Sequence, residues 1–487
     1  MGCASLAGLS DGAGSDAGEK GADASRDAGR VVDSARDVTV AKDASKDVVV
    51  GPARDGANDV ERMGDGGQEA TVNGCVDAAP QSWSPTALGP LPGRDQAAIF
   101  WTGTDYLIYG GLTWSSVPTP ELGPDGGAVP TPDGGFPLGC SLQGSTSCSD
   151  GARYNPTTQT WTRISNVGAP GAYRWDVSWA FGGQQLFTFS GHGAGAEGWL
   201  YDLPTDTWKE VSTVGVPTQR AYHVSYYVGG EFFVWGGEDT AAVDGSVGLP
   251  LNTGGIYDPA TDTWQPMNTT NAPPGGAYYA TATSDAYMFV FGGQTDPTPW
   301  IQVVPTVLGT GYLYDYNQNS WKQVSTVNAP EPREYTAAVW TGSKFVVYGG
   351  SGANTNFYDN TGGIYDPATD TWVAMSTTLA EGDAGDAGAV PAVYPRNMVW
   401  TGKRVLIWGP LGGTTTPSIG LIFDPEANAW NGAITTVNST PATNSSTGYT
   451  NVWNGTVMLQ WGEALNDAGT FSRNPGAGAL YTPPCVP

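Results

Sequence analysis

Short runs of alternating polar and apolar residues recur along the chain and predict β-strands. Residues 333–340, REYTAAVW, alternate, and residues 341–344, TGSK, have the composition of a turn. Residues 345–350, FVVYGG, read as a buried strand that ends in a glycine pair. Alternation is typical of a half-buried strand, and these units show no 3.6-residue periodicity of a helix. The pattern therefore predicts a β-hairpin over residues 333–350.

The same hairpin pattern recurs at 94–111, 220–237 and 396–409, and a second hairpin follows it each time. The second hairpin is clearest in TGGIYDPATDTW, which stands unchanged at 253–264 and at 361–372. Its DPATD segment has turn chemistry, because proline presets φ and aspartate can bond its own backbone. We therefore expect each unit to contain four short antiparallel strands.

The second hairpins share a tryptophan at their end. These residues are Trp161, Trp208, Trp264, Trp321, Trp372 and Trp430. A four-stranded unit of this size cannot bury both faces alone, and radial stacking of such sheets around an axis solves this problem. We expect each terminal aromatic side chain to pack against the neighbouring unit. We expect the glycine pairs to allow close approach of backbones. The pattern predicts an all-β propeller.

The recurring set of an arginine, an aromatic-Thr-Gly turn, a glycine pair, Tyr-Asp-Pro and a tryptophan resembles the kelch repeat. The resemblance covers roughly residues 83–487. It implies a kelch-type β-propeller, with an architecture distantly similar to that of galactose oxidase. It implies much less about activity, because one fold hosts many functions.

Seven strands end in a glycine pair or its remnant, but only six tryptophan strands follow them. The last unit, which runs through 455–462 and 478–484, lacks its tryptophan strand. An orphan strand with Trp83 lies at 81–88, near the other end of the chain. We expect this strand to complete the last blade and to close a seven-bladed ring. Six blades with an irregular seventh unit is the competing count.

Residues 1–74 differ from the rest of the chain, because they are rich in Ala, Asp, Gly and Ser and contain no aromatic residue. Low hydrophobicity with charge predicts a disordered acidic tether, followed by a propeller over 75–487. No run approaches the 18 apolar residues of a membrane-spanning helix. The start MGCAS looks like the end of a bacterial lipoprotein signal, which implies a lipidated Cys3. An ordinary cytosolic start is the alternative.

Four cysteines lie near the propeller ends or in its longest loop, 112–150. Cys75 precedes the orphan strand, Cys485 follows the last strand, and Cys140 and Cys148 lie in the loop. Four cysteines allow three connectivities. Ring closure favours Cys75–Cys485 with Cys140–Cys148, and unpaired buried thiols are the alternative. Disulfides would suit an extracytoplasmic location, at the bacterial outer membrane or cell surface or in secreted form.

The formal net charge of −26 makes nucleic acid a poor partner. Membrane contact is expected only through the lipid on Cys3, and we expect a monomer. The composition suits a propeller and is compatible with carbohydrate binding.

The loops from the second to the third strand vary widely in length, whereas the other connections are uniform. Function normally resides on variable loops of a rigid scaffold, so this face is the predicted binding face. Its candidate ligand-binding residues are the repeated arginines, a histidine and loop aromatics: Arg94, Arg174, Trp175, Arg220, His223, Trp300, Arg333, Tyr358 and Arg396. An arginine ring would clamp an anionic ligand. Buried ion pairs between blades are the alternative.

Few residues are candidates for catalysis or metal binding. The chain has two histidines, His192 and His223, and its cysteines are assigned elsewhere, so a copper site like that of galactose oxidase is not expected. Glu238, Asp239 and Arg220 are candidates for acid–base chemistry like that of a kelch-type sialic acid mutarotase. The aspartates of the repeated DPATD turns are interpreted as turn caps and not as calcium ligands.

We therefore expect no catalytic residue, metal or cofactor. The predicted function is binding of a protein or a glycan through the long loops. A carbohydrate-active enzyme, a sugar oxidase or a mutarotase-like protein on the same face, is the alternative. A deep pocket with convergent titratable groups would indicate the enzyme.

Overall fold

The protein is described by a computed structural model. It describes residues 82–91, 94, 96–113, 146–171, 176–241, 248–295, 306–352, 359–379, 388–393, 395, 397–410, 418–434, 450–462 and 478–483. All of them belong to one compact unit. They contain strands and turns but no helix, so none of them forms a helix of the length and apolar character that a membrane crossing needs. The predicted tether, 1–74, lies outside the described residues.

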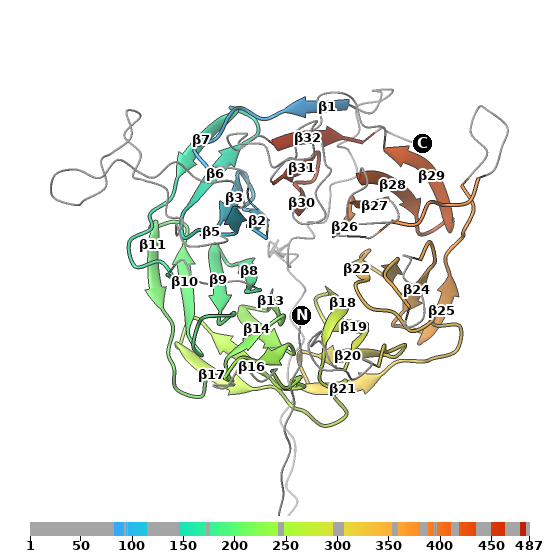
Figure 1. Cartoon of the computed structure of the whole chain (residues 1–487), viewed down its shortest axis with the longest axis horizontal. Helices are drawn as coiled ribbons and strands as arrows, with labels where there is room; N and C mark the ends of the chain where they lie inside the picture. The colour runs from blue at the N-terminus through green and yellow to red at the C-terminus, as the bar shows by residue number, and fades with distance from the viewer. Residues whose placement is uncertain are drawn as a thin grey trace, which may run out of the picture. The chain divides into compact units, whose positions relative to one another are not determined.

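The strands form seven four-stranded antiparallel sheets around an axis, which we call blades 1 to 7 (Figure 1). From the inner to the outer strand, blade 1 contains β2 (Ala98–Trp101), β3 (Tyr106–Tyr109), β6 (Gly151–Asn155) and β7 (Thr160–Arg163). Blade 2 contains β8 (Ser178–Gly182), β9 (Gln185–Phe189), β10 (Gly198–Asp202) and β11 (Thr207–Glu210). Blade 3 contains β13 (Val224–Val228), β14 (Glu231–Trp235), β16 (Gly254–Asp258) and β17 (Thr263–Pro266). Blade 4 contains β18 (Ala277–Thr283), β19 (Tyr287–Gln294), β20 (Gly311–Asp315) and β21 (Ser320–Gln323).

The other three blades have the same order. Blade 5 contains β22 (Ala337–Trp340), β23 (Phe345–Tyr348), β24 (Gly362–Asp366) and β25 (Thr371–Ala374). Blade 6 contains β26 (Asn397–Trp400), β27 (Val405–Pro410), β28 (Ser418–Asp424) and β29 (Ala429–Ile434). Blade 7 contains β30 (Thr450–Trp453), β31 (Met458–Trp461), β32 (Gly478–Thr482) and β1 (Ser82–Pro85). Two short pairs, β4 (Leu112–Thr113) with β5 (Thr146–Ser147) and β12 (Arg220–Ala221) with β15 (Glu238–Asp239), lie outside the blades.

The ring closes where the first strand joins the last. Strand β1 pairs antiparallel with β32, with Trp83 opposite Tyr481 (Figure 1). The Trp83 ring lies 5.6 Å from that of Trp408 in blade 6. Trp83 thus takes the place of the outer-strand tryptophan in blade 7. The seven-bladed propeller predicted from the sequence is confirmed, and the six-bladed count is wrong.

The hydrophobic core lies between the blades, as seven clusters that each join two neighbouring sheets. At the junction of blades 4 and 5, the Trp372 ring lies 6.0 and 5.2 Å from those of Phe289 and Phe291. Each outer tryptophan therefore buries apolar surface that its own blade cannot cover, as the repeat predicts.

The repeated turn of the second hairpin also links neighbouring blades. Asp370, whose φ is 55°, accepts hydrogen bonds from the Tyr365 hydroxyl and the Ser325 amide, both at 2.8 Å. The Trp372 indole N–H donates to the Ser325 carbonyl oxygen at 2.8 Å. Asp366 accepts a bond from the Ala368 amide at 2.9 Å and caps the turn. The aspartates are thus engaged in the scaffold.

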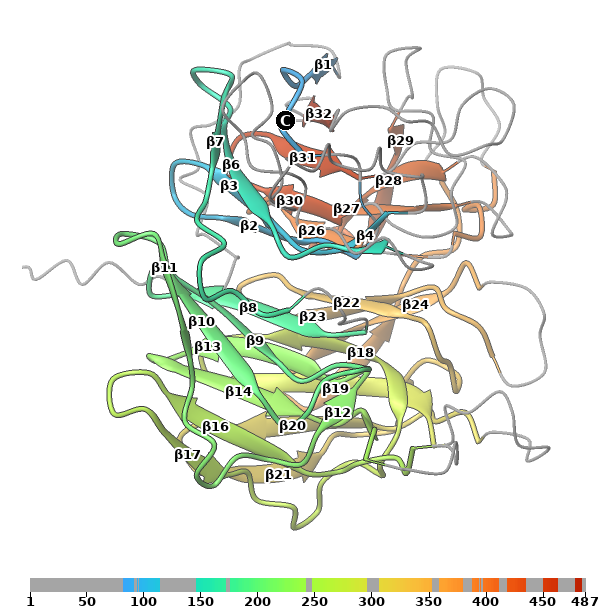
Figure 2. The ribbon, with the colours of Figure 1, turned by 60° about the vertical axis from the view of Figure 1, so that its left-hand side comes forward.

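The ends of the second strands meet the starts of the next blades at one mouth of the ring (Figure 2). The Gly191 amide donates to the Arg220 carbonyl oxygen at 2.9 Å, and Gly293 makes the same bond to Arg333 at 2.8 Å. Gly292 has a φ of 72°, and a Cβ atom there would collide with the Arg333 backbone oxygen at the start of the next blade. The glycine pairs therefore allow a tight junction at this mouth.

Candidate functional site

The repeated arginines lie inside the blades. Arg94, Arg220 and Arg333 are 0–1% exposed. The Arg220 guanidinium donates to the backbone oxygens of Gly236 and Thr253 at 3.1 and 2.7 Å, and Arg333 makes the corresponding bonds in blade 5. Each guanidinium therefore joins the end of a second strand to the start of the third strand. Burial lowers the pKa of Arg220 to about 10, so this group stays charged at neutral pH.

Of these three arginines, only Arg94 pairs with a carboxylate, that of Asp150, at 2.5 Å. The ion-pair alternative therefore describes Arg94, whereas backbone carbonyl and threonine hydroxyl oxygens accept the hydrogen bonds of the other two. Buried guanidinium groups cannot reach a ligand at the rim. We therefore leave all three out of the candidate site.

His223 is also buried, with 6% of its surface exposed. Burial, together with the nearby charge of Arg220, lowers the pKa of His223 to about 3. The imidazole is therefore neutral at physiological pH, and it forms part of a pocket wall. A neutral imidazole offers no charge to a ligand, so we leave His223 out of the charged candidate site.

The other predicted ligand-binding residues, Arg174, Trp175, Trp300, Tyr358 and Arg396, lie outside the described residues. The same holds for four of the cysteines: Cys3, Cys75, Cys140 and Cys485. Cys148 is described and is disulfide-bonded. Its predicted pairing with Cys140, and that of Cys75 with Cys485, stay predictions.

A set of left-handed residues surrounds the mouth. The residue two positions after the repeated arginine, or after the glycine that replaces it in blade 4, has a positive φ in five consecutive blades. These residues are Gln96, Asp176, Tyr222, Tyr278 and Tyr335, with φ from 50° to 60°. Such a conformation is uncommon for residues other than glycine and is enriched at functional sites.

Backbone bonds link these residues from blade to blade. The Tyr222 amide donates to the Asp176 carbonyl oxygen at 3.1 Å, and the Tyr335 amide donates to the Tyr278 oxygen at 3.2 Å. The strained turns therefore support one another across blade boundaries. This support fixes where their side chains enter the mouth.

His192 lies at this mouth between two carboxylates. Its Nδ1 atom is 3.3 Å from Asp176 Oδ2, and its Nε2 atom is 3.3 Å from Glu238 Oε1. Partial burial disfavours the imidazolium, but hydrogen bonds and charge from both carboxylates outweigh it and raise the pKa of His192 to about 9. His192 is therefore a cation at neutral pH. Among the described residues, no group of His, Cys, Asp and Glu is arranged to hold a metal ion.

Three tyrosines continue the surface away from His192. The Tyr222 ring lies 5.3 Å from the His192 ring and 5.6 Å from Tyr278, which lies 4.2 Å from Tyr335. Burial raises the pKa of Tyr222 and of Tyr278, so both phenols are neutral. We call Asp176, His192, Tyr222, Glu238, Tyr278 and Tyr335 the mouth cluster.

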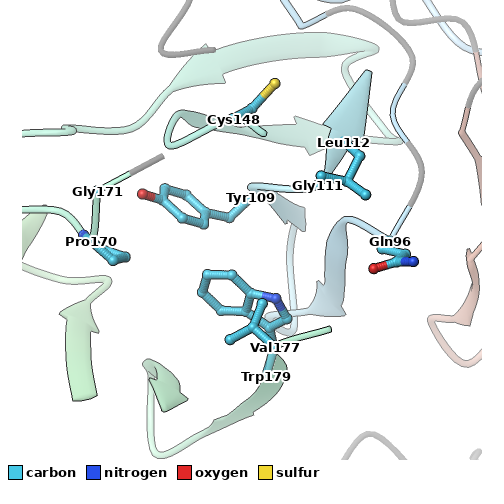
Figure 3. A pocket seen from close by; sticks show the side chains of 9 residues that line it. All are labelled: Gln96, Tyr109, Gly111, Leu112, Cys148, Pro170, Gly171, Val177 and Trp179. Carbon is cyan, nitrogen blue, oxygen red and sulfur yellow. The ribbon is translucent and has the colours of Figure 1, made fainter. Parts of the chain in front are cut away.

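An open pocket of about 220 Å³ adjoins this cluster, and three of the six cluster residues line it. Asp176, Tyr222 and Tyr278 line it, and Trp235 and Tyr279 form further parts of its wall. A smaller pocket between blades 1 and 2 is lined by the rings of Tyr109 and Trp179, which lie edge to face (Figure 3). Its volume of about 20 Å³ is close to the room for a single water molecule. The larger pocket is therefore the candidate site.

Comparison with known proteins places this architecture in a family. The family model of the Attractin/LZTR1 beta-propeller matches residues 136–416, more than half of the chain. The chain belongs to this family.

Two relatives of the Attractin/LZTR1-type propeller are similar over shorter stretches. "Kelch-like protein 25" of Xenopus tropicalis is 25% identical over 199 residues, which cover 40% of this chain and 28% of the relative. "Dynein alpha chain, flagellar outer arm" of Chlamydomonas reinhardtii is 31% identical over 104 residues, 21% of this chain and 2% of that protein. The chain thus spans less than a third of the length of either relative.

The mouth cluster of this Attractin/LZTR1-type propeller contains residues that are not among the ligand-binding residues predicted from the sequence. In the sequence, His192 is a candidate only for copper, and Glu238 only for acid–base chemistry. A signal for the tyrosines is present, because RAY, GAY and REY occupy the same repeat position at 220–222, 276–278 and 333–335. An aromatic residue at one offset in three neighbouring blades indicates a shared patch near the axis.

Proposed function

We propose that the chain is an interaction module that binds a partner protein at the mouth cluster. The observation that carries the proposal is a row of three neighbouring tyrosines, two of which, Tyr222 and Tyr278, line an open pocket together with the carboxylate of Asp176. Kelch-like relatives support an interaction role for the propeller. Tyrosine is enriched among residues that dominate binding energy, because it offers a large amphipathic surface at low entropic cost.

The local backbone supports binding by a preformed surface. Tyr222, Tyr278 and Tyr335 leave the backbone at left-handed positions that bonds between blades hold in place. Side chains held this way lose less freedom when a partner binds. We expect the partner to contact blades 2 to 5, which supply the mouth cluster.

The proposal is tested by measuring the affinity of a captured partner for variants of the full chain. Tyr278→Ala should weaken binding by about tenfold or more, in the range of residues that dominate an interface. Glu210→Gln, a change at an exposed site of the outer strand β11, should leave affinity unchanged. Equal affinity for the natural chain and Tyr278→Ala would place binding elsewhere.

A second candidate function is a sugar oxidase or a mutarotase-like activity. His192, Asp176, Glu238 and Tyr222 are titratable groups that converge beside the pocket, which is the arrangement an acid–base enzyme requires. Turnover of a sugar that is lost in Glu238→Gln would favour the enzyme. A glycan array with the same variants separates sugar binding from protein binding.

We also propose an extracytoplasmic location with a lipid anchor at Cys3. The support is the MGCAS start and the disulfide of Cys148. Mass spectrometry of the N-terminal peptide tests it, and an unmodified Met1 or Cys3 on the mature protein would contradict it.

A further inference from the structure

The charges of the mouth cluster are unbalanced. Asp176 and Glu238 supply two carboxylates, and the imidazolium of His192 lies between them. Glu238 is only 7% exposed, so water screens it poorly. The guanidinium of Arg220 is engaged with backbone oxygens inside its own blade. The described residues of the site therefore carry more negative than accessible positive charge, in a chain whose formal net charge is −26.

The tyrosine rings of the site also favour a positively charged ligand. Tyr278 stands between Tyr222 and Tyr335, with ring centroids 5.6 and 4.2 Å away. The face of an aromatic ring is electronegative and attracts a cation within about 6 Å of its centroid. Two of these rings and the Asp176 carboxylate line one pocket, and they favour the same kind of ligand. Among the described residues, an anionic group would meet two carboxylates there and one cation, His192, which already lies between them.

We propose that the mouth cluster accommodates a cationic side chain of the partner, an arginine or a lysine, over the tyrosine rings and beside Glu238 and Asp176. This inference rests on the proposed function and names the chemistry of the group that enters the pocket. Arginine fits best, because its flat guanidinium both stacks on aromatic rings and pairs with carboxylates.

His192 acts in this account as a resident cation. It already occupies one side of both carboxylates, at 3.3 Å from each, and it repels a second positive charge. A neutral residue in its place would remove the positive charge that lies beside both carboxylates. Removing His192 should therefore strengthen cation binding, whereas a purely structural role would predict weaker binding.

The test uses short peptides as probes of the full chain. Acetyl-Gly-Arg-Gly-amide is titrated and followed by ligand-observed NMR, with the matched citrulline, lysine and glutamate peptides. Citrulline keeps the shape of arginine and lacks its charge. We expect the arginine peptide to bind about three- to tenfold more tightly than the citrulline peptide. The preference should shrink between about 0.01 M and about 0.15 M ionic strength.

Variants assign the preference to the mouth cluster. Glu238→Gln and Tyr278→Ala should each weaken binding of the arginine peptide by about threefold or more, and Tyr278→Phe should preserve it. His192→Gln should tighten binding by about threefold or more. Glu210→Gln, a matched loss of one exposed carboxylate outside the cluster, should leave it unchanged. Circular dichroism checks that each variant is folded.

Equal binding of the arginine and citrulline peptides would overturn the inference, and so would tighter binding of the glutamate peptide. Weaker binding in folded His192→Gln would overturn the role of His192. These failures differ from a failure of the proposed function. If a partner binds through Tyr278 but the site shows no preference for arginine, the proposed interaction role is retained. Only the inference that a cationic side chain enters the site is then wrong.

Discussion

His192 lies in the segment SGHG, where neither adjacent residue is charged, yet the fold brings two carboxylates to 3.3 Å from its ring. Asp176 comes from the start of blade 2, and Glu238 comes from β15 beyond the second strand of blade 3. The pKa of His192 is raised to about 9 by these two partners despite partial burial. Local sequence cannot show this, because the charge partners are brought together only by the ring.

The raised pKa predicts a definite pH dependence of stability. A group whose folded pKa lies above its ordinary value of 6.5 stabilises the folded state fully below that value, and the contribution is lost as pH rises through about 9. His192→Gln should therefore lower the free energy of unfolding by about 1–2 kcal/mol at pH 6, discounted for partial exposure. The difference should fade above pH 9 in urea unfolding. A constant difference between pH 6 and pH 10 would contradict the account.

At the scale of elements, the repeated hairpin is readable in sequence because its turn residues act locally. Asp366 caps its own turn, and such a bond depends on residues two positions apart. Asp370 also reaches Ser325 of the preceding blade, 45 residues away, and this contact is not visible in one repeat. The repeated arginines are likewise visible in the sequence, but their burial is not. It depends on strand ends that only the fold brings together.

The link between blades predicts different effects for two substitutions of Asp370. Asp370→Ala removes the acceptor for Tyr365 and Ser325 and should cost about 1–2 kcal/mol of stability. Asp370→Asn should cost less than about 0.5 kcal/mol, because Asn tolerates φ above zero and keeps an acceptor oxygen.

In blades 4 and 6, asparagine naturally occupies the turn position that Asp370 has in blade 5, so these blades already show the effect of Asp370→Asn. Asn319 and Asn428 occupy the same turn position and accept bonds from the Asn268 and Ser376 amides. Thermal unfolding of the two Asp370 variants compares the effects directly. Equal losses of stability in both would show that hydrogen bonding at this position is not what matters.

At the scale of the whole molecule, the ring is completed by a strand from the start of the propeller. Trp83 contacts Trp408 of blade 6 and Tyr481 of its own blade. The count of seven blades was predictable, since an unpaired strand and an incomplete unit stood at opposite ends of one repeat array. The binding surface was less predictable, because its residues come from four blades and only its three tyrosines share a repeat position, whereas His192 and Glu238 do not.

The closure makes Trp83 important for overall stability. Trp83→Ala should lower the free energy of unfolding by about 3 kcal/mol, as for other large buried aromatic side chains, discounted slightly for partial exposure. Leu88→Ala, at a residue that is 68% exposed just beyond the closing strand, should change it by less than about 0.5 kcal/mol. Urea unfolding followed by tryptophan fluorescence measures both. Equal stability of the natural chain and Trp83→Ala would mean that the ring does not depend on this strand.

The most direct test of the central claim, that the mouth cluster is the partner-binding surface, is photo-crosslinking from single positions. A photoreactive phenylalanine is placed at Tyr278 in one sample and at Val373, an exposed residue of the outer strand β25, in another. The account predicts a crosslink to one partner protein from position 278 and none from position 373. Crosslinks from position 373 alone, or equal yields from both positions, would contradict it.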